Sequence, residues 1–223
     1  YKLFTIMKSY KASDDYYDSV DKTLSVDEDE YESAGFVWNY DKLLEMCSDA
    51  VGYIYQKGVM SYPIVQAEDN DKYLRTLMNG EYNVGGTIFV DARFPMGMEG
   101  KYSIVYGHNM YNSSMFGTLP NYTDKEYCLE HPYFDIYIGY RHYRYYVFSA
   151  FVADADGFVY TFDLEDGEYK AFYDRLRASG SYETDVRELT EDDHVIVLST
   201  CVNWHDYAYR NVVCLVRGEE ISD

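Results

Sequence analysis

The feature that most constrains the fold is a series of short apolar runs, rich in Val, Ile, Tyr and Phe, that starts at Val51 and is broken by turn residues. Such runs predict strands. The expected strands cover residues 51–55, 60–66, 86–90, 102–107, 134–138, 144–153, 159–162, 194–200 and 211–217. Pro63 places the second run at a sheet edge or a strand start. Many short strands joined by turns are typical of a barrel or a sandwich, so the fold class is mainly β with helices.

Helices are expected before the strands and once among them. Tyr10–Val20 lacks clean alternation, and Ser33–Val51 holds apolar residues at near-helical spacing, so two N-terminal helices are expected. A later helix is expected to open at Asp166–Glu168 and to run to about Ala178, because residues 169, 172, 173 and 176 follow helical spacing. With no repeat or linker, one domain over residues 1–223 is the simplest organisation, with a helical region at 1–50 and a β core at 51–217.

The charge of the chain excludes one class of partner. Thirty-nine acidic residues against 19 basic ones give a net charge of −20, so nucleic acid would be repelled. The acidity favours solubility first, and attraction to cationic wall polymers or amine-bearing substrates second. Twenty-eight tyrosines are typical of exported β proteins. No apolar run approaches the roughly 20 residues that span a bilayer, and no signal peptide is visible.

The cysteines indicate one reactive thiol among structural ones. Four cysteines, at positions 47, 128, 201 and 214, are too few for a disulfide scaffold in 223 residues. No C-x-x-C spacing occurs, so we expect no zinc site, and the sequence calls for no other metal or cofactor.

Three polar residues stand at strand ends. Cys201 follows the run Val195–Leu198, His108 follows Gly107, and Arg210 opens the last strand. A residue at a strand end is held by the sheet and still exposed at its rim. A thiol becomes nucleophilic near a base or a cation, His carries protons near neutral pH, and Arg binds an oxyanion. Strand context alone favours a structural thiol at Cys201, a surface histidine and a solubilising arginine, but the three together form a catalytic set.

The sequence resembles the class B sortases. The resemblance rests on Leu198–Cys201 with Arg210, and on ordered blocks that span about residues 51–217. These blocks are Val51–Ile54, Tyr62–Gln66, Asp69–Leu74, Gly86–Asp91, Tyr106–Met110, Ser114–Phe116 and Leu119. A Thr-Cys pair alone carries little information, whereas this ordered series is specific.

The resemblance implies a closed eight-stranded β barrel, with N-terminal helices and a long helix between the sixth and seventh strands. It implies a membrane anchor upstream of Tyr1 and a site on the outer face of a Gram-positive cell. The implied reaction cleaves a C-terminal sorting signal after its threonine. The acyl group then passes to an amine of a cell-wall precursor or to a pilin lysine, so the partners are surface proteins or pilins that carry the signal.

Residue roles follow from the same resemblance. Cys201 would attack the threonine carbonyl, His108 would protonate the leaving amine and deprotonate the incoming one, and Arg210 would stabilise the oxyanion. The groove for the signal would be lined by Asn70, Leu74, Phe158, Val159 and Ser199. Many relatives carry an acidic residue two positions after the cysteine, where this chain has Asn203, and Asp206 could take that role.

Two other functions remain open from the residues. A cysteine hydrolase would use the same thioacyl chemistry with water as the acceptor. A non-enzymatic surface adhesion module would account for the tyrosines and the acidity, and its Cys201 thiol would be inert. The sequence does not fix the sorting motif or the acceptor amine. The family usually recognises an Asn-Pro-x-Thr-like signal. A monomer is the default expectation.

Overall fold

Eight strands close into a barrel in the computed structural model, which describes residues 2–24, 38–203 and 206–221. The order around the barrel is β1-β2-β3-β4-β7-β8-β6-β5. The strands are β1 Ala50–Gln56, β2 Met60–Val65, β3 Ile88–Val90, β4 Tyr102–Tyr106, β5 Tyr133–Ile138, β6 Arg141–Asp154, β7 Val195–Asn203 and β8 Asp206–Ile221. The expected closed eight-stranded barrel is therefore confirmed.

Two of the neighbouring pairs are parallel, β2 with β3 and β4 with β7. The remaining pairs are antiparallel, and the longest ladder joins β6 to β8. Parallel neighbours require a long connection, and the one from β4 to β7 contains β5, β6 and the helix α5, Tyr169–Ala178. This arrangement brings the carboxyl ends of β4 and β7 to the same edge of the barrel.

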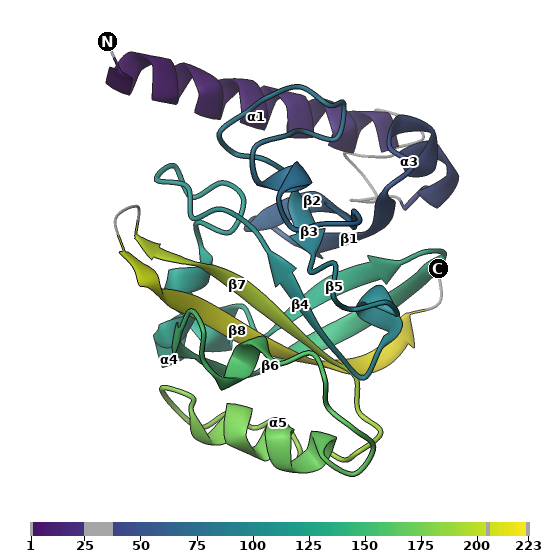
Figure 1. Ribbon diagram of the computed structural model, residues 1–223, viewed down its shortest axis with the longest axis vertical. Helices are drawn as coiled ribbons and strands as arrows, with labels where there is room; N and C mark the ends of the chain where they lie inside the picture. Colours follow the sequence, from purple (N-terminus) through teal and green to yellow (C-terminus); the bar gives the residue numbers. More distant parts are fainter. Residues whose placement is uncertain (1, 25–37, 204–205, 222–223) are drawn as a thin grey trace.

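The first helix, α1, covers Lys2–Leu24 and lies across one side of the barrel (Figure 1). Its buried residues are Tyr10, Ser13, Tyr17, Val20 and Leu24, at alternating spacings of three and four that define one helical face. The Tyr17 hydroxyl donates to the carbonyl oxygen of Gly86 at 2.8 Å and lies 2.8 Å from the Thr87 hydroxyl oxygen. This face ties α1 to the segment just before β3.

The second N-terminal helix is shorter than the sequence predicts. The helix α3 covers only Tyr40–Met46, and β1 has begun by Ala50, so the expectation of a helix to Val51 is wrong. The Asn39 side chain caps the start by accepting from the backbone N–H of Lys42 at 3.0 Å. Cys47 is already extended, which ends the helix there. The expected start at 33–37 lies outside the described residues.

The later helix α5 confirms the expected helix between the sixth and seventh strands, and it lies on the side of the barrel away from α1 (Figure 1). The strand expected at 159–162 is wrong. Phe158–Tyr160 is a 3₁₀ turn, η4, closed by a 3.0 Å hydrogen bond from the Tyr160 N–H to the Gly157 carbonyl oxygen. Val159 is fully buried in the same apolar cluster as the α5 residues. An apolar run can be buried in a turn as well as in a strand, so the run alone did not distinguish the two.

Short helices complete the fold. They are η1 Lys72–Leu74, η2 Gly97–Glu99, η3 Leu119–Thr123 and α4 Lys125–Glu130. The helix α4 was not expected from the sequence; the Asp124 side chain caps its start by accepting from the N–H groups of Glu126 and Tyr127. No helix among the described residues is long and apolar enough to cross a bilayer.

Candidate active site

The alternation of side chains along β7 and β8 decides which residues reach the candidate site. On β7, Ile196 and Leu198 belong to the core inside the barrel, whereas Val195 and Val197 pack with α5 on the outer face. Successive residues of a strand point to opposite faces, so Cys201 shares the outer face with Val195 and Val197. This face is covered by α5 along most of β7 and is open at the end of the strand.

The register brings the three predicted residues together across three neighbouring strands. Cys201 lies directly opposite Arg210 in the antiparallel pair of β7 and β8. Tyr106 of β4 lies opposite Ser199 of β7 in the parallel pair. His108 lies two residues past Tyr106, beyond the end of β4, and lines the same cleft as Cys201 and Arg210. Since β4, β7 and β8 are consecutive in the barrel, His108, Cys201 and Arg210 form a row at one edge.

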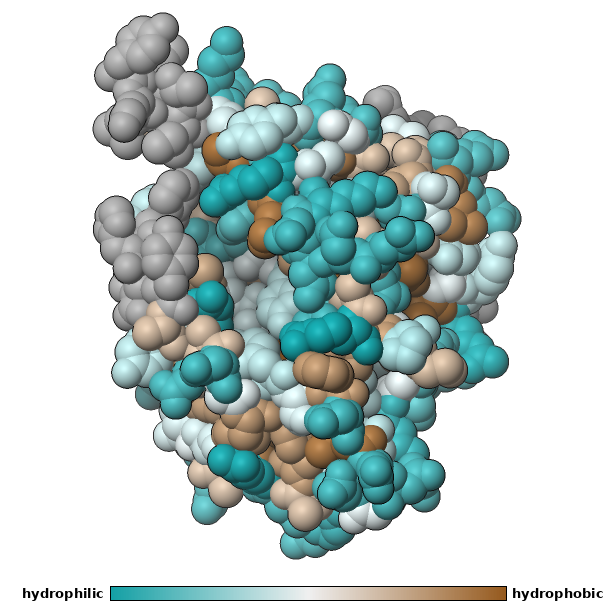
Figure 2. Space-filling view, viewed as in Figure 1, coloured by the Kyte–Doolittle hydropathy of each residue, from teal (hydrophilic) through white to brown (hydrophobic). Residues whose placement is uncertain are grey.

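A cleft of about 590 Å³ opens on this row. Figure 2 shows the corresponding hollow near the middle of the face, with pale atoms of intermediate hydropathy inside it. The predicted residues that line it are Asn70, Leu74, His108, Ser199, Cys201 and Arg210. The other lining residues are Asp71, Thr87, Phe89, Arg93, Tyr106, Gly107, Ala155, Asp156, Tyr160 and Thr200. The cleft therefore gathers six of the eight predicted site residues.

The two remaining residues lie elsewhere. Val159 is fully buried under α5, and Phe158 packs edge-on against Phe172 with the Arg175 guanidinium 3.8 Å from its ring centroid. Neither lines the cleft, because η4 turns both side chains toward α5. Their neighbour Tyr160 lines it instead, with its hydroxyl 3.0 Å from the Ser199 hydroxyl. Sequence reasoning missed Tyr160, although it directly follows the two residues that were chosen.

The imidazole of His108 is held by the backbone of η1. Its Nε2 lies 2.7 Å from the carbonyl oxygen of Leu74, which can only accept, so Nε2 carries the proton and Nδ1 keeps a lone pair in the neutral ring. Burial lowers the pKa of His108; the hydrogen bond to Leu74 acts in the opposite direction, and the positive charge of Arg75 lowers the pKa further. The net pKa is below the usual value, which favours the neutral ring at pH 7.

Two amide side chains fix the backbone at Cys201. Asn109 donates to the carbonyl oxygens of Cys201 at 2.9 Å and Val202 at 3.3 Å, and Asn211 donates to that of Cys201 at 3.4 Å. The Thr200 hydroxyl donates to the Gly107 carbonyl oxygen at 2.8 Å. These bonds tie the segment that carries His108 to the strand that carries the half-buried Cys201 thiol. The sequence showed Asn109 next to His108, but only the strand register reveals what it holds.

Arg210 presents its guanidinium at the start of the open half of β8. One Nη1–H donates to the carbonyl oxygen of Tyr209 at 2.9 Å. A guanidinium has five N–H donors and keeps its charge at any working pH, so it can bind a carbonyl oxygen that becomes negative. Asn203 and Asp206 face each other in the backbone register, and their side chains lie outside the described part of the chain.

A buried carboxylate, Asp91, orients three of the side chains that line the cleft. Asp91 is fully buried, yet it accepts hydrogen bonds from Asn70 at 3.0 Å, from Tyr106 at 3.0 Å and from the Arg93 guanidinium at 2.6 Å. Burial raises the pKa of Asp91, but the bonds from Arg93, Asn70 and Tyr106 outweigh it, so the pKa is lowered overall. Asp91 thus fixes three side chains that line the cleft.

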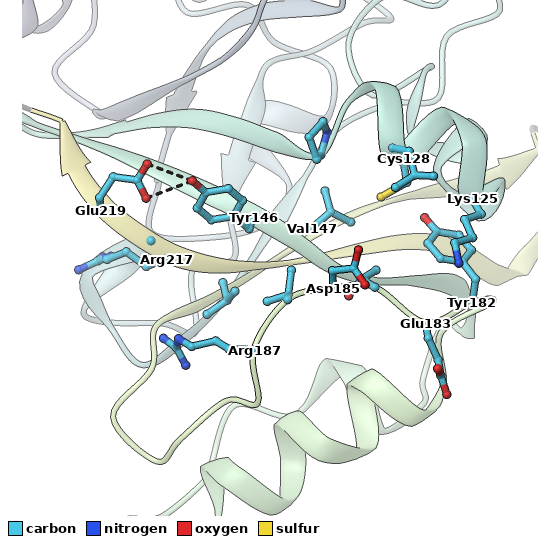
Figure 3. A pocket seen from close by; sticks show the side chains of 16 residues that line it. Lys125, Cys128, Tyr146, Val147, Tyr182, Glu183, Asp185, Arg187, Arg217 and Glu219 are labelled. Carbon is cyan, nitrogen blue, oxygen red and sulfur yellow. Dashed lines mark hydrogen bonds between the residues drawn. The ribbon is translucent and has the colours of Figure 1, made fainter.

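The other thiols lie in different surroundings. Cys128 lines a second cavity of about 500 Å³, between α4, residues 182–187, the middle of β6 and the later part of β8. Figure 3 shows Cys128 at the far end of this cavity from the hydrogen-bonded pair of Tyr146 and Glu219. Burial raises the pKa of Cys128, so its thiol stays protonated. No histidine is among the described residues that line this cavity, and it has no counterpart of the row at Cys201.

Comparisons with known proteins agree with this geometry. Residues 54–217 match the family model of the sortase domain. Sortase B of Listeria monocytogenes is 32% identical over 164 residues, which are 73% of this chain and 65% of that relative. Sortase B of Staphylococcus aureus is 26% identical over 185 residues, 82% of this chain and 75% of that relative. This chain thus spans about two thirds of the length of the Listeria protein.

The solved structures show the same fold. A Staphylococcus aureus sortase B–substrate complex superposes with a TM-score of 0.82 at 22% identity, covering 96% of this chain and all of that one. A Bacillus anthracis sortase B in complex with AAEK1 gives a TM-score of 0.78 at 27% identity, again over 96% of this chain. The family match comes from the sequence, and these structures independently match the barrel and its helices.

Proposed function

Because the chain belongs to the sortase family, with class B sortases as its relatives, we propose that it is a cysteine transpeptidase that cleaves a C-terminal sorting signal after threonine. The released protein is joined to an amine of a cell-wall precursor or of a pilin. The observation that carries the proposal is the row of His108, Cys201 and Arg210 at one edge of three neighbouring strands, within a single cleft.

The first half of the reaction uses all three residues. The Cys201 sulfur attacks the threonine carbonyl carbon, and its proton passes to Nδ1 of His108, the nitrogen that the bond to Leu74 leaves with a lone pair. The carbonyl oxygen becomes negative and accepts hydrogen bonds from Arg210. The carbon–nitrogen bond then breaks, His108 returns the proton to the leaving amine, and a thioester remains on Cys201.

The second half reverses these roles. A neutral acceptor amine attacks the thioester carbonyl, and its proton passes to His108, whose lowered pKa favours the neutral ring that can accept it. The carbon–sulfur bond breaks, an amide forms, and the thiolate recovers a proton from His108. Water in place of the amine would give hydrolysis on the same residues.

The cleft walls are proposed to bind the signal. Asn70 and Ser199 offer polar groups, and Leu74 offers a 39% exposed apolar side chain. Asp91 fixes the Asn70 amide, so this contact is preorganised rather than flexible. We propose that the enzyme acts at the cell surface on the outer face of the membrane, held by an anchor upstream of Tyr1.

A reporter peptide with an Asn-Pro-x-Thr-like signal, flanked by a fluorophore and a quencher, tests the proposal. Wild-type protein should release fluorescence, and Cys201→Ala should not. Added triglycine should raise turnover and yield a ligated product, visible by mass spectrometry. Cys128→Ala is the matched control, since its thiol lies in the other cavity and turnover should persist.

Two results would contradict parts of the proposal. Cleavage by Cys201→Ala at the wild-type rate would remove Cys201 as the nucleophile. Hydrolysed product alone, at every triglycine concentration, would make the protein a cysteine hydrolase rather than a transpeptidase.

A further inference from the structure

An apolar groove adjoins the cleft at Cys201, on the side where β4 begins. Its volume is about 260 Å³, and it opens between the loop of residues 94–101 and the segment 162–169 that leads into α5. The buried rings of Phe94 and Tyr102 line it, together with Met96 and Phe162, whose side chains are 67% and 53% exposed. Large apolar side chains that gather in one exposed groove indicate a binding surface.

The lining of the groove lacks the negative charge that dominates the chain. No aspartate or glutamate is among the described residues that line it, although the net charge of the chain is −20. Lys101 also lines the groove, but its ammonium lies 3.3 Å from the carboxylate of Asp166 and 3.7 Å from that of Asp192. A charged ligand would lose its hydration here without gaining a partner, so the groove favours an apolar side chain.

Hydrogen bonds hold both walls of the groove in place. The Gln66 side chain donates to the carbonyl oxygen of Phe94 at 2.9 Å, which fixes the loop that carries Met96. The Tyr102 hydroxyl donates to the carbonyl oxygen of Val159, in the segment that forms the other wall. A groove with fixed walls loses little conformational entropy when a ligand binds.

The groove and the cleft meet at one stacked pair of side chains. Arg93 lines the cleft, and its guanidinium carbon lies 4.6 Å from the centroid of the Phe162 ring, which lines the groove. Arg93 is held in turn by Asp91 at 2.6 Å. Figure 2 shows apolar atoms next to the hollow, on the side where α5 lies. A polypeptide in the cleft can therefore pass from Cys201 over this pair into the groove.

The strand register gives the direction of the groove and its distance from Cys201. Tyr102 of β4 lies opposite Val195 of β7, which is six residues before Cys201, or about 20 Å at the usual rise of a strand. His108, which must reach the leaving amine, lies past the other end of β4. The part of a signal that precedes its threonine therefore runs toward the groove, and an extended chain reaches it about six residues before the threonine.

We propose that this groove is a specificity subsite for the polypeptide that precedes the sorting motif. It takes one large apolar side chain, such as leucine, about three positions before the first residue of an Asn-Pro-x-Thr-like motif. The inference rests on the proposed function, because that function places the threonine at Cys201. The bound side chain contacts Met96 and Phe162. This contact holds the acyl part on the enzyme while the C-terminal part leaves and the acceptor amine enters.

Matched peptides test the subsite through their rates of cleavage. Each peptide carries the same Asn-Pro-x-Thr-like signal and the same upstream spacer of serine and glycine, with or without one leucine three positions before the motif. The leucine should raise kcat/KM about tenfold, which is the lower end of what one apolar group contributes in a pocket. The same leucine placed after the threonine should give no gain.

Two exposed apolar residues provide a matched pair of variants. Met96→Ser should remove most of the gain from leucine and leave cleavage of the serine–glycine peptide unchanged, because Met96 lines the groove and not the cleft. Leu129→Ser removes a side chain that is 63% exposed in the cavity at Cys128, and it should leave both rates unchanged. No gain from leucine in the wild-type protein, or an equal loss of that gain in the two variants, would overturn the proposal.

A binding measurement separates this proposal from the proposed reaction. The Cys201→Ala variant leaves the peptides intact, so fluorescence anisotropy can measure its affinity for each of them, and the leucine peptide should bind about tenfold more tightly. Equal affinities would rule out the subsite. Tighter binding of the leucine peptide without cleavage by the wild-type protein would contradict the transpeptidase and still support the subsite. A dimer in sedimentation that Met96→Ser abolishes would assign the groove to a second copy of the chain and reject the proposal.

Discussion

The outer face of β7 and β8 has two halves that differ in what covers them. In one half, Val197 of β7 faces Cys214 of β8, and both are fully buried beneath α5. In the other half, Cys201 faces Arg210 and opens into the cleft. The two pairs are four residues apart on β7, or about 13 Å at the usual rise of a strand. The same face of one sheet therefore holds a structural thiol and the candidate nucleophile.

The comparison shows that the cover, and not the strand, decides the chemistry of a thiol. Burial raises the pKa of Cys214 well above the usual value, because an apolar environment disfavours the thiolate. Cys201 follows the same alternation but lies beyond the reach of α5. The sheet fixes where each sulfur points, and α5 fixes which of the two meets the solvent.

The largest expected difference between the two halves is in the rate at which their thiols are alkylated. We expect iodoacetamide to modify Cys201 at least about a thousandfold faster than Cys214, since Cys214 reacts only after an opening that costs several kcal/mol. Peptide mass spectrometry of timed samples at neutral pH measures both rates. In denaturant the two alkylation rates should converge. Similar rates in the native protein would mean that α5 does not protect Cys214 from the reagent.

Two arginines offer the next contrast. Arg210→Ala should lower kcat by about 10²- to 10³-fold, because a donor to the developing oxyanion is lost. Arg175→Ala, in the covered half, should leave kcat unchanged and cost about 0.5–1 kcal/mol of unfolding free energy, since its guanidinium lies over the Phe158 ring. Steady-state kinetics and thermal unfolding of both variants provide the measurements. A kcat for Arg210→Ala near that of wild type would remove Arg210 from the reaction.

Two buried carboxylates give a smaller and matched contrast. Asp91→Asn should raise KM for the signal peptide several-fold and cost about 2 kcal/mol, because Asn70 and Arg93 lose the acceptor that orients them. Asp193→Asn removes a carboxylate that accepts from Arg187 and Thr190 near α5, so it should destabilise the fold with KM unchanged. A higher KM in both variants would indicate a general loss of stability rather than a role of Asp91 in the cleft.

The smallest expected effect is a shift in pH dependence. The lowered pKa of His108 predicts that kcat/KM rises with pH through a limb below pH 6.5, as the ring loses its proton. Arg75→Gln removes a positive charge that disfavours the imidazolium, so the pKa of His108 should rise. NMR titration of His108 and the pH–rate profile measure it. Arg187→Gln, in the other cavity, should leave the acid limb of the kcat/KM profile unchanged. A lower pKa of His108 in Arg75→Gln would contradict the assignment of this limb to His108.

Most of the strands were predictable from their apolar runs, but only the resemblance to the class B sortases chose a closed barrel over a sandwich. The cysteine, the histidine and the arginine could be picked out because each stands where a predictable strand ends, and their roles stay a prediction. The sequence was insufficient at Phe158 and Val159, since an apolar run does not reveal whether it forms a strand or a buried turn. The sequence also did not show that Asn109 and Asp91 hold other residues of the site in place. Their partners lie on other strands, and only the pairing of β4 with β7 and the closure of the barrel bring those partners within hydrogen-bond distance.

The parallel pairing of β4 with β7 has a consequence for the order of folding. Asn109 and Cys201 are 92 positions apart, and the helix α5 with two other strands lies between them. Contacts of such long range form late, because the entropy of closing the loop is lost before any contact compensates for it. A chain still folding can therefore pair Cys201 with Arg210, which is close in sequence, before the segment that carries His108 and Asn109 has joined them. The pairing of β4 with β7 therefore completes the fold and assembles the candidate site in one step.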